Sequence, residues 1–344
     1  MNQRRKIRLF FTLLIAGVLL LFCLDLLLGS VLISPAKLIR SVGPDGEEYL
    51  RDILLVFRLP KALTAILVGS GLSLAGLMMQ TLFRNPLAGP FVLGISSGAS
   101  LGVAIFVMAA GIGGLSIIGM PFVGSLGLVG ASMLGSVLVM MLVIAVSVRV
   151  NDSVSILIIG IMFGSITGAI VSVLEYFSDP DTVHSFLVWT FGSISGVTWN
   201  QFVIFAPIVV TGILFTLFMQ KPLNALLLGE NYARGIGVDV KRSRLWIILL
   251  TSVIAGGLTA FTGPIAFIGV AVPHLARNLL KSSDHRILIP ATICIGSILM
   301  LCCDIISQMP GSNQVLPINS VTALFGAPVV IWVITRRKRR SLAN

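Results

Sequence analysis

Ten apolar segments divide this chain, and each is a candidate to cross the hydrocarbon core of a bilayer, which is about 30 Å thick. They lie at about 9–33, 59–83, 91–113, 121–148, 154–177, 199–219, 245–262, 265–280, 287–308 and 318–335. Only 11% of the residues are charged, whereas soluble domains carry about 25%, so a water-soluble enzyme is excluded. The sequence predicts an all-α, multi-pass membrane protein with ten transmembrane helices in one domain over residues 1–344. The eighth segment is short and contains Pro273, and residues 178–198 can hold a short extra helix outside the membrane.

Lys and Arg are distributed unevenly around these segments. They gather before residue 9 and at 221–244, 277–286 and 336–340, all on the side of the membrane that the two termini share. The opposite side has only Lys37, Arg40, Arg51, Arg58 and Lys61. Because cytoplasmic loops carry the excess of Lys and Arg, both termini are predicted to be cytoplasmic. The net charge of +11 is therefore a topology signal in a lipid-embedded protein, and no nucleic-acid partner is expected.

Motifs for catalysis, metal binding and nucleotide binding are missing from the sequence. The phosphate-binding pattern GxxxxGK[ST] is absent, as are HExxH and GxSxG. We therefore expect no catalytic residue, no metal site and no cofactor in this chain, and if ATP drives the protein, another subunit binds it. Among the acids only Asp25 and Asp304 lie clearly within spans, both toward the outer ends. Ion-coupled carriers commonly place ionisable groups near the middle of the membrane, so an ion relay has little support.

Glycines recur at intervals of four residues in two segments. Because a spacing of four keeps small residues on one helix face, where backbones can approach closely, we interpret both sets as packing surfaces. The sets are Gly94, Gly98 and Gly102, and Gly160, Gly164 and Gly168.

The longest cytoplasmic loop, 221–244, has the pattern of a short amphipathic helix followed by a turn. Leu223, Leu226 and Leu227 share one helical face, and Gly229 is placed to end the helix before Glu230 begins another turn. Two interpretations stay open: a basic helix that rests on anionic lipid headgroups, and a docking element for a cytosolic partner.

Four long motifs resemble the membrane permeases of ABC importers for iron-siderophores, haem and cobalamin. They run over residues 57–100, 228–238, 263–286 and 316–337, in the order that the family has them. The resemblance implies ten transmembrane helices per subunit in the bacterial inner membrane, two permease copies around a central path, and two cytosolic ATPase subunits that bind ATP and Mg. It also implies an extracytoplasmic substrate-binding protein that delivers the ligand.

The resemblance assigns roles to residues at the predicted outer and inner ends of the spans. Arg58 and Lys61 match cations that dock the binding protein; their alternative role is that of interface anchors for the lipid. A third family cation falls on Gln308, so that salt bridge is expected to be missing or shifted.

The resemblance also assigns cytoplasmic residues. Asn85, Leu87 and Ser153 match a cytoplasmic gate, although a turn at Pro86 without any gating role is a fair rival. The residues matched to the ATPase-coupling helix are Gly229, Glu230, Ala233, Arg234 and Gly237.

The function that the sequence predicts is that of a permease subunit, in a homodimer, that moves a metal chelate inward. An iron-siderophore or haem is placed ahead of cobalamin as the cargo. The alternative is an ion-coupled secondary carrier that works without an ATPase, and a third reading is a structural membrane subunit. Loss of uptake when the ATPase's nucleotide-binding Lys is changed would separate the first from the other two.

Overall fold

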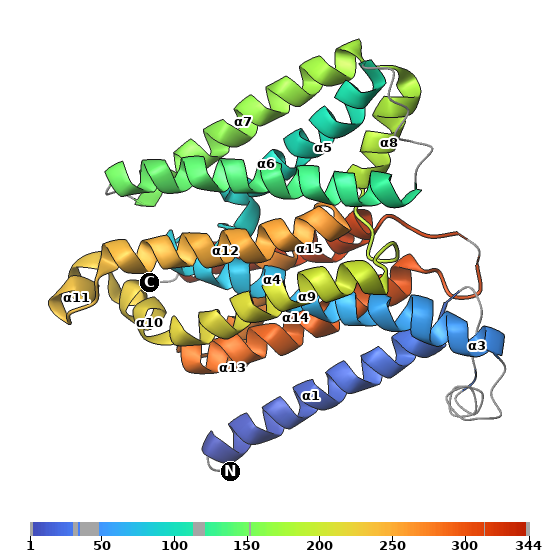
Figure 1. Ribbon diagram of the computed structural model, residues 1–344. Helices are drawn as coiled ribbons and strands as arrows, with labels where there is room; N and C mark the ends of the chain where they lie inside the picture. Colours follow the sequence, from blue (N-terminus) through green and yellow to red (C-terminus); the bar gives the residue numbers. More distant parts are fainter. Residues whose placement is uncertain are drawn as a thin grey trace. The chain divides into compact units, whose positions relative to one another are not determined.

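A computed structural model describes residues 3–29, 34, 48–112, 121–150, 153–312 and 314–341 of the chain, and all the regular elements in this part are helical (Figure 1). The elements are α1 (Gln3–Leu27), α3 (Glu48–Asp52), the π-helix η1 (Ile53–Arg58), α4 (Leu59–Leu82), the 3₁₀-helix η2 (Pro90–Leu93), α5 (Ile95–Ile112), α6 (Pro121–Arg149), α7 (Ser153–Phe177), α8 (Pro180–Thr190), α9 (Trp199–Phe218), α10 (Gln220–Leu228), α11 (Glu230–Gly235), α12 (Val240–Thr262), α13 (Ile268–Leu280), α14 (His285–Ser307) and α15 (Ile318–Ser341).

Each of the ten predicted segments contains a helix, and seven helices in the described part of the chain are long and apolar enough to cross a bilayer. The apolar stretches of α5 and α15 are shorter, at Ile95–Met108 and Ile318–Trp332. The helix α13 has 13 residues and contains Pro273, as expected for the weak eighth segment. Residues 178–198 do hold a short helix, α8. A multi-pass helical membrane protein is thus confirmed, while ten crossings and cytoplasmic termini stay predictions.

The second predicted span differs from expectation at its start. Helical structure begins at Glu48 and continues through α3, η1 and α4, although the apolar segment begins only at residue 59. Leu50 and Leu54 are buried there, against Leu26 and Ile53. This local packing extends the helix through a stretch that the charges Arg51 and Arg58 had marked as a loop.

The chain forms two compact units, Met1–Leu74 with Ser193–Pro207 and Ala266–Asn344, and Ala75–Gly192 with Ile208–Ile265. In the first unit α14 packs against α1, α13 and α15. The backbones of α4 and α14 come close at Gly69 and Gly296, where a Cβ on either glycine would meet the carbonyl oxygen of the other.

In the second unit α5 packs against α6, α7 and α8, and α12 packs against α5 and α6 (Figure 1). The first glycine set lies at the contacts with α6 and α7. A Cβ at Gly98 would lie 2.6 Å from the carbonyl oxygen of Gly135 on α6, and one at Gly94 would lie 3.0 Å from that of Gly160 on α7. The packing interpretation is confirmed for these positions. At Gly168 a Cβ would meet no atom of the described residues within 4 Å, so for this position the packing interpretation stays a prediction.

Candidate functional site

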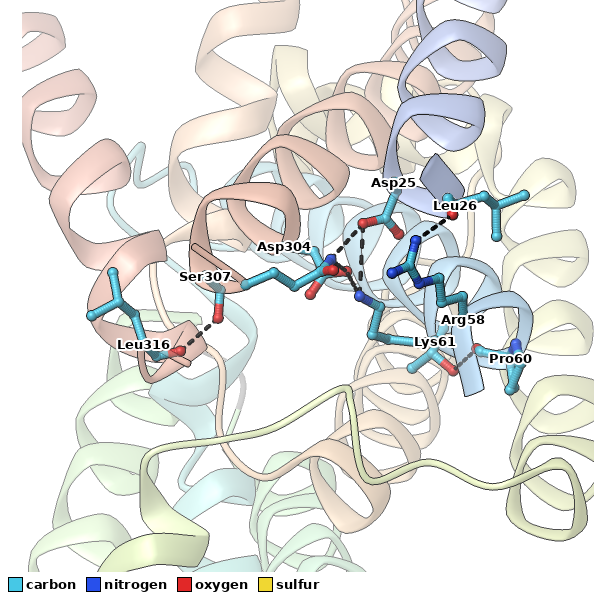
Figure 2. Close-up of polar contacts among 10 residues, drawn as sticks. Asp25, Leu26, Arg58, Pro60, Lys61, Asp304, Ser307 and Leu316 are labelled. Atoms are coloured by element: carbon cyan, nitrogen blue, oxygen red, sulfur yellow. Dashed lines mark hydrogen bonds and ion pairs between the residues drawn. The ribbon is translucent and has the colours of Figure 1, made fainter. Parts of the chain in front are cut away.

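A buried cluster of charged side chains lies in the first unit (Figure 2). The ammonium of Lys61, at the start of α4, lies 3.1 Å from Asp304 Oδ2 on α14 and 3.8 Å from Asp25 Oδ1 on α1. The amide of Gln308 donates to Asp25 Oδ1 at 2.7 Å and to Asp304 Oδ2 at 3.0 Å. Burial of an ionised group is costly unless it is paired, so this cluster fixes the ends of three helices to one another.

Arg58, next to this cluster, contacts the C-terminal end of α1. Its Nη1 donates to the carbonyl oxygen of Leu26 at 2.7 Å, within the last turn of α1, where carbonyl groups lack partners along the helix. A Cβ at Gly29 would lie 2.7 Å from Nη2 of the same guanidinium. Arg58 therefore caps the C-terminal end of α1, and a residue larger than glycine at position 29 would displace it.

The two predicted docking cations are thus largely buried, with 7% of Arg58 and 6% of Lys61 exposed. Both border a hollow of about 460 Å³ whose wall also includes Tyr49, Phe57 and Gln308. The structure brings the two cations together and gives each a partner within the chain. At Gln308, where the family cation is replaced, the amide binds two carboxylates instead. Docking of a binding protein at this hollow stays a prediction.

The first predicted gate position is a non-helical turn after α4. Asn85 Oδ1 accepts a hydrogen bond from the backbone N–H of Leu87 at 2.9 Å, and the N–H of Ala88 donates to the carbonyl oxygen of Asn85 at 3.1 Å. Arg84, just before it, has a left-handed backbone with φ +48°. The turn expected from Pro86 is confirmed, and its Leu87 is 44% exposed.

The predicted amphipathic helix and turn are present as α10 and α11. Leu223 and Leu226 are buried on the inner face of α10. Gly229 ends the helix with φ +123°, a conformation that side chains with a Cβ rarely adopt. Ala233 is fully buried, and its N–H donates to the carbonyl oxygen of Gly229 at 2.8 Å. We call Gln220–Gly235 the α10–α11 segment.

Arg84 connects this segment to the first gate turn. Its Nε lies 3.3 Å from the carbonyl oxygen of Leu226, and a Cβ at Gly229 would lie 2.5 Å from its Nη2. The guanidinium thus lies over Gly229. A groove of about 460 Å³ opens beside it, bordered also by Val154, Glu230 and Tyr232.

Arg244, on α12, connects the segment to the end of α6. Its Nη2 lies 2.8 Å from Glu230 Oε1, and its Nη1 donates to the carbonyl oxygen of Val150 at 3.3 Å. Arg244 is 3% exposed. The predicted coupling residue Arg234 also contacts Glu230, at 3.5 Å, with 56% of its side chain exposed.

The predicted cytoplasmic residues therefore fall into one neighbourhood of the second unit. The Asn85 turn lies next to the α10–α11 segment through Arg84. Ser153 begins α7, and its side chain lies outside the described residues. Gly237 has φ +84°, and in the described part of the chain no atom lies within 4 Å of a Cβ placed there.

Sequence reasoning did not single out Arg84 or Arg244, and it named Asp25, Lys61 and Asp304 separately without predicting that they form one cluster. The available signal for Arg244 and for the cluster was an ionisable residue inside or at the end of an apolar helix, which has to find a partner of opposite charge.

Bilayer-length apolar helices with ionised side chains paired between them define an integral membrane protein whose polar clusters hold helix ends together. The FecCD transport family matches residues 17–336, and this chain belongs to it. It is a permease subunit of an ABC importer.

Relatives and one solved structure agree over nearly the whole chain. The hemin transport system permease protein HmuU of Yersinia pestis is 32% identical, over 99% of both chains. The vitamin B12 import system permease protein BtuC of Vibrio cholerae is 31% identical, over 94% of this chain and 93% of its own. An inward-facing structure of a transporter assigned to the metal-chelate ABC type superimposes with a TM-score of 0.82 at 27% identity, covering 95% of this chain and 99% of the other.

Proposed function

We propose that this chain forms the membrane path by which an ABC importer carries a metal chelate, such as haem, an iron-siderophore or cobalamin, into the cytoplasm. The observation that carries the proposal is similarity over almost the entire chain to permeases named for hemin and for vitamin B12. The family match over residues 17–336 contains the gate turn and the α10–α11 segment, to which we assign the coupling to ATP, as well as the spans.

The proposed assembly has two copies of this chain, two cytosolic ATPase subunits that bind ATP and Mg, and an extracytoplasmic binding protein. In the proposed topology the chain crosses the bacterial inner membrane ten times, with both termini in the cytoplasm. This topology puts the α10–α11 segment on the cytoplasmic side, where the ATPase subunits bind. The groove beside Glu230 and Tyr232 supports this, because it is open at the surface and Tyr232, on its wall, is 51% exposed and accessible to a partner.

Residue roles follow from this arrangement. Gly229, Glu230, Ala233, Arg234 and Gly237 form and position the ATPase-coupling element. Asn85, Leu87 and Ser153 form the cytoplasmic gate. On the opposite side, Arg58 and Lys61, which both border the hollow in the first unit, dock the binding protein.

An ion-coupled carrier would need an ionisable group that is available to a transported cation. The cluster in the first unit supplies two carboxylates, but Lys61 and Gln308 bind both of them. This pairing favours a structural role for the cluster and thus the ATP-driven importer.

The test is uptake into proteoliposomes that contain the chain with the ATPase and binding protein that co-purify with it. Labelled haem, siderophores and cobalamin are offered in competition. We expect uptake of one class that needs ATP on the cytoplasmic side and stops when the Lys of the ATPase's GxxxxGK[ST] motif is changed. Uptake by the chain alone, driven by a proton or sodium gradient, would contradict the proposal.

A further inference from the structure

The α10–α11 segment is tied to the rest of the second unit by two arginines, and each tie leads to a predicted gate position. Arg84 is the residue immediately before Asn85, and Arg244 bonds Val150, three positions before Ser153. We propose that Arg84 and Arg244 are positioning residues that transmit movement of the α10–α11 segment to these two gate positions. The proposal rests on the proposed function of the chain as an ABC importer permease.

The contacts of Arg244 hold α11 firmly to the end of α6. A guanidinium is planar, stays charged and can use separate N–H groups for separate acceptors. Here one terminal nitrogen faces Glu230 at the start of α11 and the other faces Val150 after α6. Because Arg244 is 3% exposed, a shift of Glu230 away from it would leave a buried charge without its carboxylate, which is strongly unfavourable. A moving α11 therefore carries Arg244, and with it the end of α6.

The tie through Arg84 is more exposed and acts on the backbone. Its side chain reaches Leu226 in the last turn of α10 and lies over Gly229. Its own backbone has the left-handed φ of +48°, a conformation that is costly for a residue with a Cβ. A shift of the end of α10 therefore acts on a backbone that leads directly into the Asn85–Leu87 turn.

The variants R84Q and R244Q test the two ties in the co-purified importer complex, reconstituted in liposomes. R244K keeps the positive charge opposite Glu230 but lacks the second terminal nitrogen, which in arginine donates to the carbonyl oxygen of Val150. R242Q is the matched control, since Arg242 lies two residues away on the exposed face of α12. Each variant is combined with Leu87→Cys or Ser153→Cys. The rate at which an impermeant maleimide modifies the new cysteine is measured by peptide mass spectrometry, with and without ATP and vanadate.

In the wild-type background we expect nucleotide to change the modification rate at both cysteines. In R84Q this change should disappear at position 87, and in R244Q at position 153. In both variants uptake should fall roughly tenfold while ATP hydrolysis stays within about twofold of wild type. A tenfold loss lies within the usual range for energetic coupling between two sites. R244K should be intermediate and R242Q unchanged. A merely structural role would lower assembly, hydrolysis and uptake together.

Two results would overturn the proposal. One is nucleotide-dependent modification at both positions that R84Q and R244Q leave unchanged. The other is a parallel loss of hydrolysis and uptake. If R244Q does not assemble, R244K decides for that arginine by the same readout. Failure of the wild-type chain to bind any ATPase would instead refute the proposed function. If uptake stays coupled to ATP hydrolysis in the wild type and in both variants, only this inference is refuted.

Discussion

The Asp25–Lys61–Asp304 cluster and the α10–α11 segment both hold charged side chains next to apolar helices, but they differ in exposure. In the cluster the paired side chains are 0–8% exposed. At the segment the side chain of Glu230 is 29% exposed and that of its partner Arg244, on α12, is 4% exposed, and a groove opens beside Glu230. A closed set of charges is hard to separate, because each lost partner leaves a buried ion. In the second set the buried Arg244 keeps its carboxylate while the partly exposed Glu230 stays accessible beside the groove. The first set therefore suits a fixed joint, and the second suits a pair that moves together when a partner binds.

The largest effect expected from this difference is at Lys61. Lys61→Met removes the cation between two buried carboxylates and should destabilise the protein by about 3–5 kcal/mol, measured by detergent-denaturant titration of the purified chain. The triple variant D25N/K61M/D304N leaves no uncompensated charge and should recover much of the loss. A Lys61→Met protein as stable as wild type would show that the cluster is not a fixed joint.

The next effect separates Gly229, within the α10–α11 segment, from Gly237, two residues after it. Gly229 and Gly237 both have positive φ, so alanine at either position carries backbone strain of about 1–3 kcal/mol. Only at position 229 would the new Cβ also meet the guanidinium of Arg84. We expect Gly229→Ala to abolish stimulation of ATP hydrolysis by loaded binding protein and Gly237→Ala to retain part of it. Equal loss in both variants would mean that Arg84 does not matter at Gly229.

A smaller effect is expected when the half-exposed acid is neutralised. Glu230→Gln keeps a hydrogen-bond acceptor opposite Arg244, which retains its bond to Val150. The loss of stability should be about 1–2 kcal/mol, well below that of Lys61→Met in the same titration. If the two variants lost equal stability, the contrast between a closed and a half-open cluster would fail.

The smallest effect concerns the start of α12, the helix that carries Arg244. Asp239 caps it by accepting a hydrogen bond from the N–H of Arg242 at 3.0 Å. Asp239→Ala should lower stability by about 1 kcal/mol, whereas Asp239→Asn, which can still cap, should be nearly neutral. Identical stability of the two variants would exclude the cap as the reason.

Local patterns predicted the helices well. Every long apolar segment contains one, and the end of α10 at Gly229 and the turn at Pro86 follow from residue types with strong backbone preferences. The early start at Glu48 was not predicted, because it depends on packing of Leu50 and Leu54 against Leu26. The contact at Gly98 was expected from spacing, yet at Gly168 the same spacing meets no described residue within 4 Å, since a pattern does not say which helix lies opposite.

The sequence by itself determined the membrane-spanning helices, the family and the turns, because hydrophobic length and backbone preference are properties of neighbouring residues. Only the tertiary structure decided the partners of the buried charges. Lys61 meets Asp304, Arg244 meets Glu230 and Val150, and Arg84 meets Leu226, pairs that lie far apart along the chain or in different helices. Hydrogen bonds need their two atoms within about 3.2 Å and contact ion pairs within about 4 Å, so these pairs exist only where folding brings the groups together.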